Sequence, residues 1–226
     1  RWIVICLTKD EGKETLLNNI KVDRNAILKS NLLSSFSVGS LGTSNIEKIY
    51  YDTDDFFFAE KGVNIYTTYD KSAKELVIRY DGEQVTRIEF LKNTPNFFKL
   101  KIGKDDGIIK YINEITEAIY KVYPTGLNVN IEEYLRKSKP QVKILKKRDS
   151  YRVVNNKGLK VTMSFDMCEY IKFGTKNKFS QSTLDIVGDN AKFKDEFVSF
   201  MKDIILEYPQ VIRIQSNELT VARNNL

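Results

Sequence analysis

The sequence has no histidine and only two cysteines. Histidine is the commonest general base and the commonest transition-metal ligand, so its absence excludes Ser-His-Asp triads, Cys-His pairs and His-zinc centres. Cys6 and Cys168 are too few for a cysteine-only zinc site. Any metal bound by this chain would therefore be a hard ion held by carboxylates.

Long apolar runs are also absent. The run Trp2-Ile-Val-Ile-Cys-Leu7 is far too short to span a membrane, so we interpret it as a buried strand and expect no membrane span. Cysteines in apolar or β-like surroundings favour buried, reduced thiols in a cytoplasmic protein over a secreted disulfide framework. A bridge between Cys6 and Cys168 stays open as an alternative.

Only four prolines interrupt the 226 residues, and no repeat, heptad pattern or low-complexity tract divides them. We therefore expect one domain over residues 1–226, which is long enough to bury a core without disulfides or metals. The start at Arg1 instead of Met leaves open that this domain was excised from a longer chain.

Positive charge is in excess. The chain has 36 Lys and Arg against 30 Asp and Glu, a net charge of +6, and a sequence pI near 9.1. This balance indicates an anionic partner. The alternative is an ordinary solvated surface in a lysine-rich protein.

Patterns typical of β-strands dominate the chain. Strands are expected at 2–7, 46–52, 63–69, 75–81, 85–92, 97–103, 141–154, 158–166, 182–187 and 211–216. About ten strands exceed the four to six of a usual open sheet, which indicates a barrel or two packed sheets.

Helices are fewer. Apolar residues recur at intervals of three and four over 192–208 and predict an amphipathic helix there. Shorter helices are expected at 13–20, 25–33, 109–122 and 131–137.

Several expected strands alternate charged and apolar residues. In Arg87-Ile-Glu89, in Lys99-Leu-Lys101 and in the run from Lys160 to Asp166, every second side chain is polar. Such a strand has one polar and one apolar face. The polar face is either wet, as in an ordinary sandwich, or lines a polar, basic tunnel inside a barrel.

Two local features have structural explanations. Asp52 stands where an aspartate is expected to cap a turn, and we favour that role over a metal ligand. Phe56, Phe57 and Phe58 have no basic residues between them, so they are expected to pack in a core and not to stack on nucleic-acid bases.

The motifs follow an order that resembles a known superfamily. Tyr50-Tyr51-Asp52-Thr53 leads to Gly62-Val63, and Lys146-Lys-Arg148-Asp-Ser-Tyr151 precedes Asp166 on the next expected strand. This order resembles the triphosphate tunnel metalloenzymes, which comprise the CYTH-type proteins and their polyphosphate-polymerase (VTC-like) relatives. The resemblance covers roughly residues 46–220, and no one of these short motifs is specific alone.

The resemblance implies an α+β fold, with an antiparallel β-barrel or tunnel of about eight strands and flanking helices. A triphosphate carries about four negative charges, so its site needs several converging cations. The candidate phosphate-binding residues are Arg79, Arg87, Lys99, Lys101, Lys146, Arg148 and Lys160. For each of them alone, a solvent-exposed role is equally open.

The carboxylates depart from the family pattern. The family opens with Glu-x-Glu-x-Lys, which holds the catalytic magnesium or manganese, whereas this chain has Trp2-Ile-Val-Ile-Cys6. Tyr66 and Thr68 stand where two arginines are expected, Asn217 stands where a lysine is expected, and a second late carboxylate is missing after Asp185. The acids left as candidate metal ligands are Glu89, Asp166 and Asp185, with Asp52 and Glu47 as more distant candidates.

These losses divide the functional hypotheses. We expect a divergent, catalytically inactive domain (a pseudoenzyme) whose basic tunnel binds a phosphorylated ligand or serves as a scaffold for a protein partner. The alternative is an active triphosphatase or phosphoryl-transfer enzyme that acts on triphosphate, a nucleoside triphosphate or polyphosphate. That enzyme would need Mg or Mn as cofactor, and the inactive domain would need none. A nucleic-acid-binding β domain is the third hypothesis.

Overall fold

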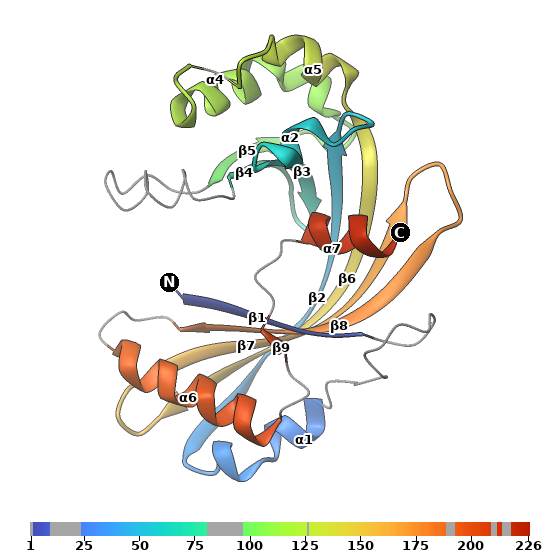
Figure 1. The fold of residues 1–226 in the computed structure, drawn as a ribbon. Coiled ribbons are helices and arrows are strands. Elements are labelled where there is room, and N and C mark those ends of the chain that lie inside the picture. Colours follow the sequence, from blue (N-terminus) through green and yellow to red (C-terminus); the bar gives the residue numbers. More distant parts are fainter. Residues whose placement is uncertain are drawn as a thin grey trace. The chain divides into compact units, whose positions relative to one another are not determined.

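The computed structural model describes residues 2–9, 24–80, 97–125, 127–188, 193–208, 212–213 and 218–226 (Figure 1). The strands are β1 (Trp2–Lys9), β2 (Phe36–Asp52), β3 (Val63–Tyr69), β4 (Lys74–Tyr80), β5 (Phe97–Ile102), β6 (Lys139–Asn155), β7 (Lys160–Lys172), β8 (Lys178–Gly188) and β9 (Ile212–Arg213). The helices are α1 (Arg24–Leu28), α2 (Phe57–Glu60), α4 (Ile112–Val122), α5 (Ile131–Lys137), α6 (Lys194–Glu207) and α7 (Glu218–Asn225), with the short 3-10 helices η1 (Asn31–Leu33) and η2 (Ile108–Tyr111).

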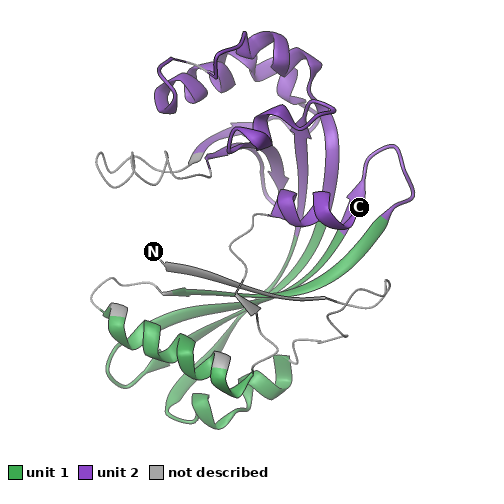
Figure 2. Cartoon of the chain, in the orientation of Figure 1, with its two compact units in different colours: residues 1–45, 145–169, 178–217 green, residues 46–144, 170–177, 218–226 purple. Residues whose placement is uncertain are grey.

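The strands belong to one nine-stranded sheet in the order β5-β4-β3-β2-β6-β7-β8-β1-β9. The chain divides into two compact units, coloured separately in Figure 2. Unit 1 consists of residues 1–45, 145–169 and 178–217, and unit 2 of residues 46–144, 170–177 and 218–226. Strands β2, β6 and β7 contribute residues to both units, and each unit has its own core.

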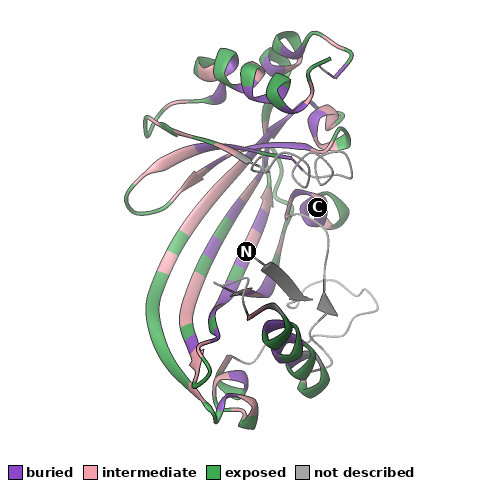
Figure 3. Cartoon of the chain, turned by 90° about the vertical axis from the view of Figure 1, so that its left-hand side faces the viewer, coloured by how far each residue is buried: buried purple, intermediate pink, exposed green. Residues whose placement is uncertain are grey.

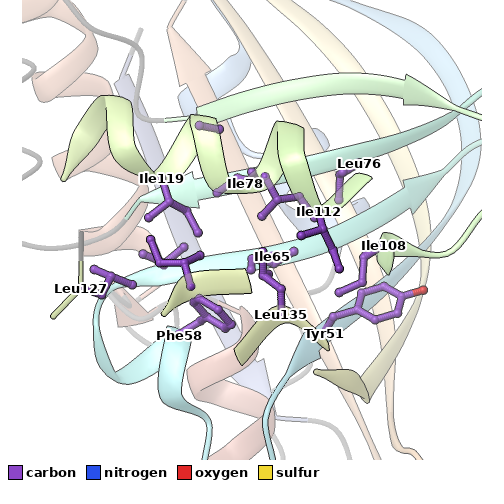
Figure 4. Close-up of a cluster of buried hydrophobic side chains, with 14 of the residues drawn as sticks. Tyr51, Phe58, Ile65, Leu76, Ile78, Ile108, Ile112, Ile119, Leu127 and Leu135 are labelled. Atoms are coloured by element: carbon purple, nitrogen blue, oxygen red, sulfur yellow. The ribbon is translucent and has the colours of Figure 1, made fainter. Parts of the chain in front are cut away.

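The core of unit 2 lies between strands β2 to β5 and the helices α2, α4 and α5. Ile65 pairs in register with Tyr51 and Ile78, and all three side chains belong to this core. Figure 4 shows side chains of the helices, Ile119 and Leu135 among them, gathered against these strand residues. Full burial of such a side chain contributes about 1.5–3 kcal/mol, so the apolar stripe of each helix holds it to the sheet.

The core of unit 1 lies under α1, η1 and α6. Val153, Met163 and Ile186 come from β6, β7 and β8, and they pack with Phe200 and Ile204 of α6. The core residues of β7 are Val161, Met163 and Phe165, two positions apart, although the residues between them are partly or fully buried as well. Buried, intermediate and exposed residues are distributed along the long strands (Figure 3). Each strand therefore buries every second side chain under helices and leaves the others on the opposite face.

The expected α+β fold, with an antiparallel, tunnel-type sheet and flanking helices, is confirmed. The described residues form nine strands, close to the expected number of about eight. None of the described helices is both long and apolar enough to cross a membrane.

Some element predictions need correction. Strand β2 begins at Phe36 and not at residue 46. The prediction missed its first part because residues 37–43 are exposed and show no alternation of apolar residues. The helix expected at 25–33 is divided into α1 and η1, and α7 was not predicted because it is short and mostly polar. Helix α2 lies between Thr53 and Gly62, where the family resemblance implied a short helix. The expected strand 85–92 and helix 13–20 lie outside the described residues.

Asp52 caps helix α2 and holds the turn that precedes it. Its Oδ1 accepts from the backbone N–H of Thr53 at 2.8 Å and of Phe58 at 3.0 Å, and its Oδ2 accepts from Ala59 N–H at 2.9 Å. Burial raises the pKa of Asp52, and these three donors oppose that rise. Gly62, whose φ of 72° suits glycine, ends the helix. The expected turn-capping role of Asp52 is confirmed.

Phe57 and Phe58 also pack in the core of unit 2, as expected, with Phe58 fully buried. Phe56 instead lies against Arg223 of α7, whose guanidinium carbon is 4.5 Å from the ring centroid. All three rings therefore have packing roles within unit 2.

We predict that Asp52→Ala lowers the free energy of unfolding by about 2–4 kcal/mol, because three N–H donors in a buried turn lose their acceptor. Asp52→Asn should lower the free energy of unfolding less than Asp52→Ala does. Its amide oxygen can still accept from Thr53 and Phe58, whereas its NH₂ group cannot accept from Ala59 N–H. Urea unfolding measures both. Asp54→Ala, an exposed acid two residues away, is the control and should change stability little. Equal losses for Asp52→Ala and Asp54→Ala would contradict the capping role.

Candidate functional site

A row of cations lies on the face of unit 2 that is opposite its core. Directly paired residues on antiparallel strands point to the same face. Lys48 pairs with Thr68, Thr68 with Glu75, and Glu75 with Lys101. The next row on this face is Tyr50, Tyr66, Val77 and Lys99. Arg79 follows Val77 by two residues and so shares the face, which we call the cationic face of unit 2.

Three of the predicted phosphate-binding residues are thus brought to one face. Arg79, Lys99 and Lys101 are all exposed on neighbouring strands β4 and β5. Lys99 Nζ lies 3.5 Å from the carboxylate of Glu75, and both groups are partly open to solvent. The strand pairing thus places these three cations on one face of unit 2, and their role in phosphate binding stays a prediction.

Helix α7 contacts the same face through Glu218. Its Oε2 accepts from Lys48 Nζ at 2.5 Å and from the Tyr50 hydroxyl at 3.1 Å. The Tyr50 ring lies 4.9 Å from the Tyr66 ring, and Lys48 Nζ lies 5.5 Å from the Tyr66 centroid. Burial raises the pKa of Tyr50 well above its ordinary value, the negative charge of Glu218 adds to the rise, and the positive charge of Arg79 opposes it.

Among the described residues, the balance of charge on this face is positive. Four cations, Lys48, Arg79, Lys99 and Lys101, are placed with two carboxylates, Glu75 and Glu218, a surplus of two. Three of these cations, Arg79, Lys99 and Lys101, are exposed, and a local surplus of positive charge attracts anions.

A second polar cluster lies in unit 1, on the face of β6, β7 and β8 opposite its core. Arg148 Nε donates to Asp166 Oδ1 at 2.7 Å, and Arg148 Nη2 donates to Asp166 Oδ2 at 2.6 Å. Lys146 Nζ lies 3.0 Å from the same Oδ2. Arg148 Nη2 also donates to Asp185. We call these four residues the Arg148 network.

The Arg148 network is largely enclosed. The side chain of Asp166 is 0% exposed and that of Lys146 is 5% exposed, whereas Arg148 and Asp185 are partly open. Beside it, the hydroxyls of Ser150 and Ser164 lie 3.0 Å apart. Of the other predicted phosphate-binding residues, Lys160 is exposed at the start of β7, and Arg87 lies outside the described residues.

The described carboxylates do not fit a magnesium or manganese ion. Mg²⁺ takes about six oxygen ligands in octahedral geometry, but both oxygens of Asp166 already accept from cations and Asp185 is bound to Arg148. Strand β1 has no acid, and its Ile5 is the register partner of Asp185. In the described ranges no group of three His, Cys, Asp or Glu could hold a metal. Glu89, the third predicted ligand, lies outside them, so the full set stays a prediction.

Sequence reasoning missed Lys48 and Glu218. Lys48 could have been found from the sequence. Ile49 and Tyr51 face the core, so Lys48, one residue before Ile49, belongs to the opposite face of β2. Glu218 could not, because its placement depends on α7, a mostly polar helix of eight residues that reaches this face only through tertiary packing.

No family model matches the chain, and no curated protein sequence matches it. Solved structures do share its fold. A structure of a putative adenylate cyclase from Bacillus halodurans superposes with a TM-score of 0.55 at 9% identity, covering 89% of this chain and 92% of the other. A putative adenylyl cyclase from Hippeastrum, reported to have a dominant triphosphatase activity, gives a TM-score of 0.52 at 11% identity, covering 98% and 95%.

We predict that stability falls above about pH 10, the ordinary pKa of tyrosine. The folded protein holds protons on Tyr50, Tyr51 and Tyr80 that the unfolded chain loses, since burial raises all three pKa values. This stability is therefore present below pH 10 and is lost as pH rises above it. Urea unfolding from pH 8.5 to 11 should show a shallower decline for Tyr50→Phe.

Glu218→Gln should also make the decline shallower, because it removes a charge that raises the pKa of Tyr50. Tyr80→Phe is the comparison, because the Tyr80 hydroxyl donates to Ala118 O in the core and does not contact Glu218. Its effect on the pH dependence of stability should therefore be additive with that of Glu218→Gln. If Tyr50→Phe and the wild-type protein decline equally, the folded protein does not hold a proton on Tyr50 that the unfolded chain loses.

Proposed function

Because the chain has the CYTH-like, triphosphate-tunnel fold, we propose that it binds an anionic phosphorylated ligand, such as triphosphate, a nucleotide or polyphosphate, without metal-dependent catalysis. The observation that carries this proposal is the cationic face of unit 2, where four cations are placed with two carboxylates. We propose no turnover of the ligand.

The geometry of the cationic face suits a chain of phosphates. Neighbouring strands lie about 4.8 Å apart, so Arg79 and the lysines of β5 present their charges at short, regular intervals on adjacent strands. Arg79 can offer two parallel N–H donors to one phosphate, and Lys99 and Lys101 add point charges. Each cation that reaches the ligand increases affinity without a bridging metal.

The Arg148 network supports the non-catalytic part of the proposal. Hydrolysis or cyclisation of a triphosphate needs metal ions to neutralise charge and to position the attacking oxygen. The described acids that could serve, Asp166 and Asp185, are already bound by Arg148 and Lys146. No step of metal chemistry is therefore assigned to these residues.

The proposal is tested by adding sodium tripolyphosphate in excess EDTA and recording the thermal midpoint and the binding isotherm. We expect the wild-type protein to be stabilised. Arg79→Gln should weaken binding by roughly tenfold or more, because a charge-assisted hydrogen bond is lost. The combination with Lys99→Gln and Lys101→Gln should abolish it.

Lys137→Gln, which makes the same change of charge on the exposed face of α5, is the control and should bind as the wild-type protein does. Two results would contradict the proposal. One is an absence of stabilisation in EDTA. The other is phosphate release from tripolyphosphate that requires Mg²⁺ or Mn²⁺. A triphosphatase activity is named for the Hippeastrum protein.

A further inference from the structure

The carboxylates of Asp166 and Asp185 come from neighbouring strands β7 and β8 and meet at one guanidinium. We propose that Arg148 is a built-in cation that occupies the place of a divalent metal between these two acids. On this proposal, the guanidinium makes the polar face of unit 1 independent of metal, and its removal alone would create a divalent-cation site there.

Asp166 is buried as a carboxylate and therefore needs nearby positive charge. Its side chain is 0% exposed, and an ionised carboxylate removed from water is strongly destabilising unless cations and hydrogen bonds compensate it. Arg148 supplies two parallel N–H donors to its two oxygens, and Lys146 approaches one of them at 3.0 Å. Asp166 is thus compensated by protein cations alone.

Asp166 and Asp185 share the guanidinium of Arg148. The nitrogen Nη2 that donates to Asp166 also donates to Asp185, so the positive charge lies between two carboxylates that would otherwise repel each other. A guanidinium cannot be deprotonated in a protein, so this cation is permanent. A metal ion bound where these two carboxylates meet would have to displace Nη2.

The charges of the four residues in the Arg148 network cancel. Lys146 and Arg148 contribute two positive charges, and Asp166 and Asp185 contribute two negative ones. A divalent ion added to this neutral network would be repelled by the two cations at short range. Without Arg148 the sum would be one negative charge, with as many as four carboxylate oxygens available to a hard cation.

The experiment measures Mn²⁺ binding to the full chain by the loss of the electron paramagnetic resonance signal of free Mn²⁺. The variants are Arg148→Gln, Asp185→Asn, and the two combined. We expect the wild-type protein and Asp185→Asn to give the same binding curve. Arg148→Gln should bind about one further Mn²⁺ per chain, and the combined variant should lose it.

Thermal unfolding gives a second measurement. Arg148→Gln in EDTA should melt about 6–20 °C below the wild-type protein, because Asp166 and Asp185 lose the guanidinium that they share and Asp166 keeps only Lys146. Mn²⁺ should restore part of this loss for Arg148→Gln and leave the wild-type midpoint unchanged. Arg152→Gln, an exposed arginine four residues further along β6, is the matched control and should gain no Mn²⁺.

Two outcomes would overturn the inference: Mn²⁺ binding to the wild-type protein that Asp185→Asn removes, or a folded Arg148→Gln variant that binds no more Mn²⁺ than the wild-type protein. If Arg148→Gln does not fold in EDTA, recovery of its circular-dichroism spectrum by Mn²⁺ but not by Na⁺ supports the inference, and no recovery refutes it. This inference concerns residues of unit 1 alone. The tripolyphosphate experiment concerns the cationic face of unit 2, so either proposal can fail separately.

Discussion

The two-residue period of the strands is the constraint on which the rest of this structure depends. Each strand must bury one face under helices, so its alternate residues are directed to the other face. In unit 2 this places Tyr51, Ile65 and Ile78 in the core and Tyr50, Tyr66 and Lys99 opposite it. In unit 1 the same rule separates Val153 and Met163 from Arg148 and Asp166. A shift of one residue in any strand would exchange charged and apolar side chains, so packing of the core also fixes the positions of the charges.

The two units compensate their charges differently. In unit 1, Asp166 is enclosed and its charge is matched by Arg148 and Lys146 in short, directional contacts. In unit 2, the contact between Lys99 and Glu75 is longer and exposed, and Glu218 reaches only one edge of the cationic face. Solvent screens exposed ion pairs, whereas enclosed ones are retained. The enclosed network therefore contributes to a fixed architecture, whereas the cations of unit 2 keep more of their side chains in contact with solvent.

Much of the fold followed from local patterns. Strands β3, β4 and β5 and helices α5 and α6 lie where periodicity predicted them, because each has one continuous apolar stripe or face. The turn at Asp52 was also predictable, since an aspartate before a short helix can accept from several backbone donors. Residues 37–43 of β2 and helix α7 were not, because both are largely polar and are held in place by partners distant in sequence.

The sequence by itself determined that histidine and cysteine metal chemistry is excluded, and that cations alternate with core residues on several strands. It also determined that the first strand has no carboxylate, since composition and period are local properties. Tertiary structure alone decided which charges meet. Arg148 and Asp185 are separated by 37 residues and Lys48 and Glu218 by 170, so only the pairing of strands and the packing of α7 could bring them into contact. Sequence alone could not show that Asp166 and Asp185 share one guanidinium, because that contact requires three strands to lie side by side.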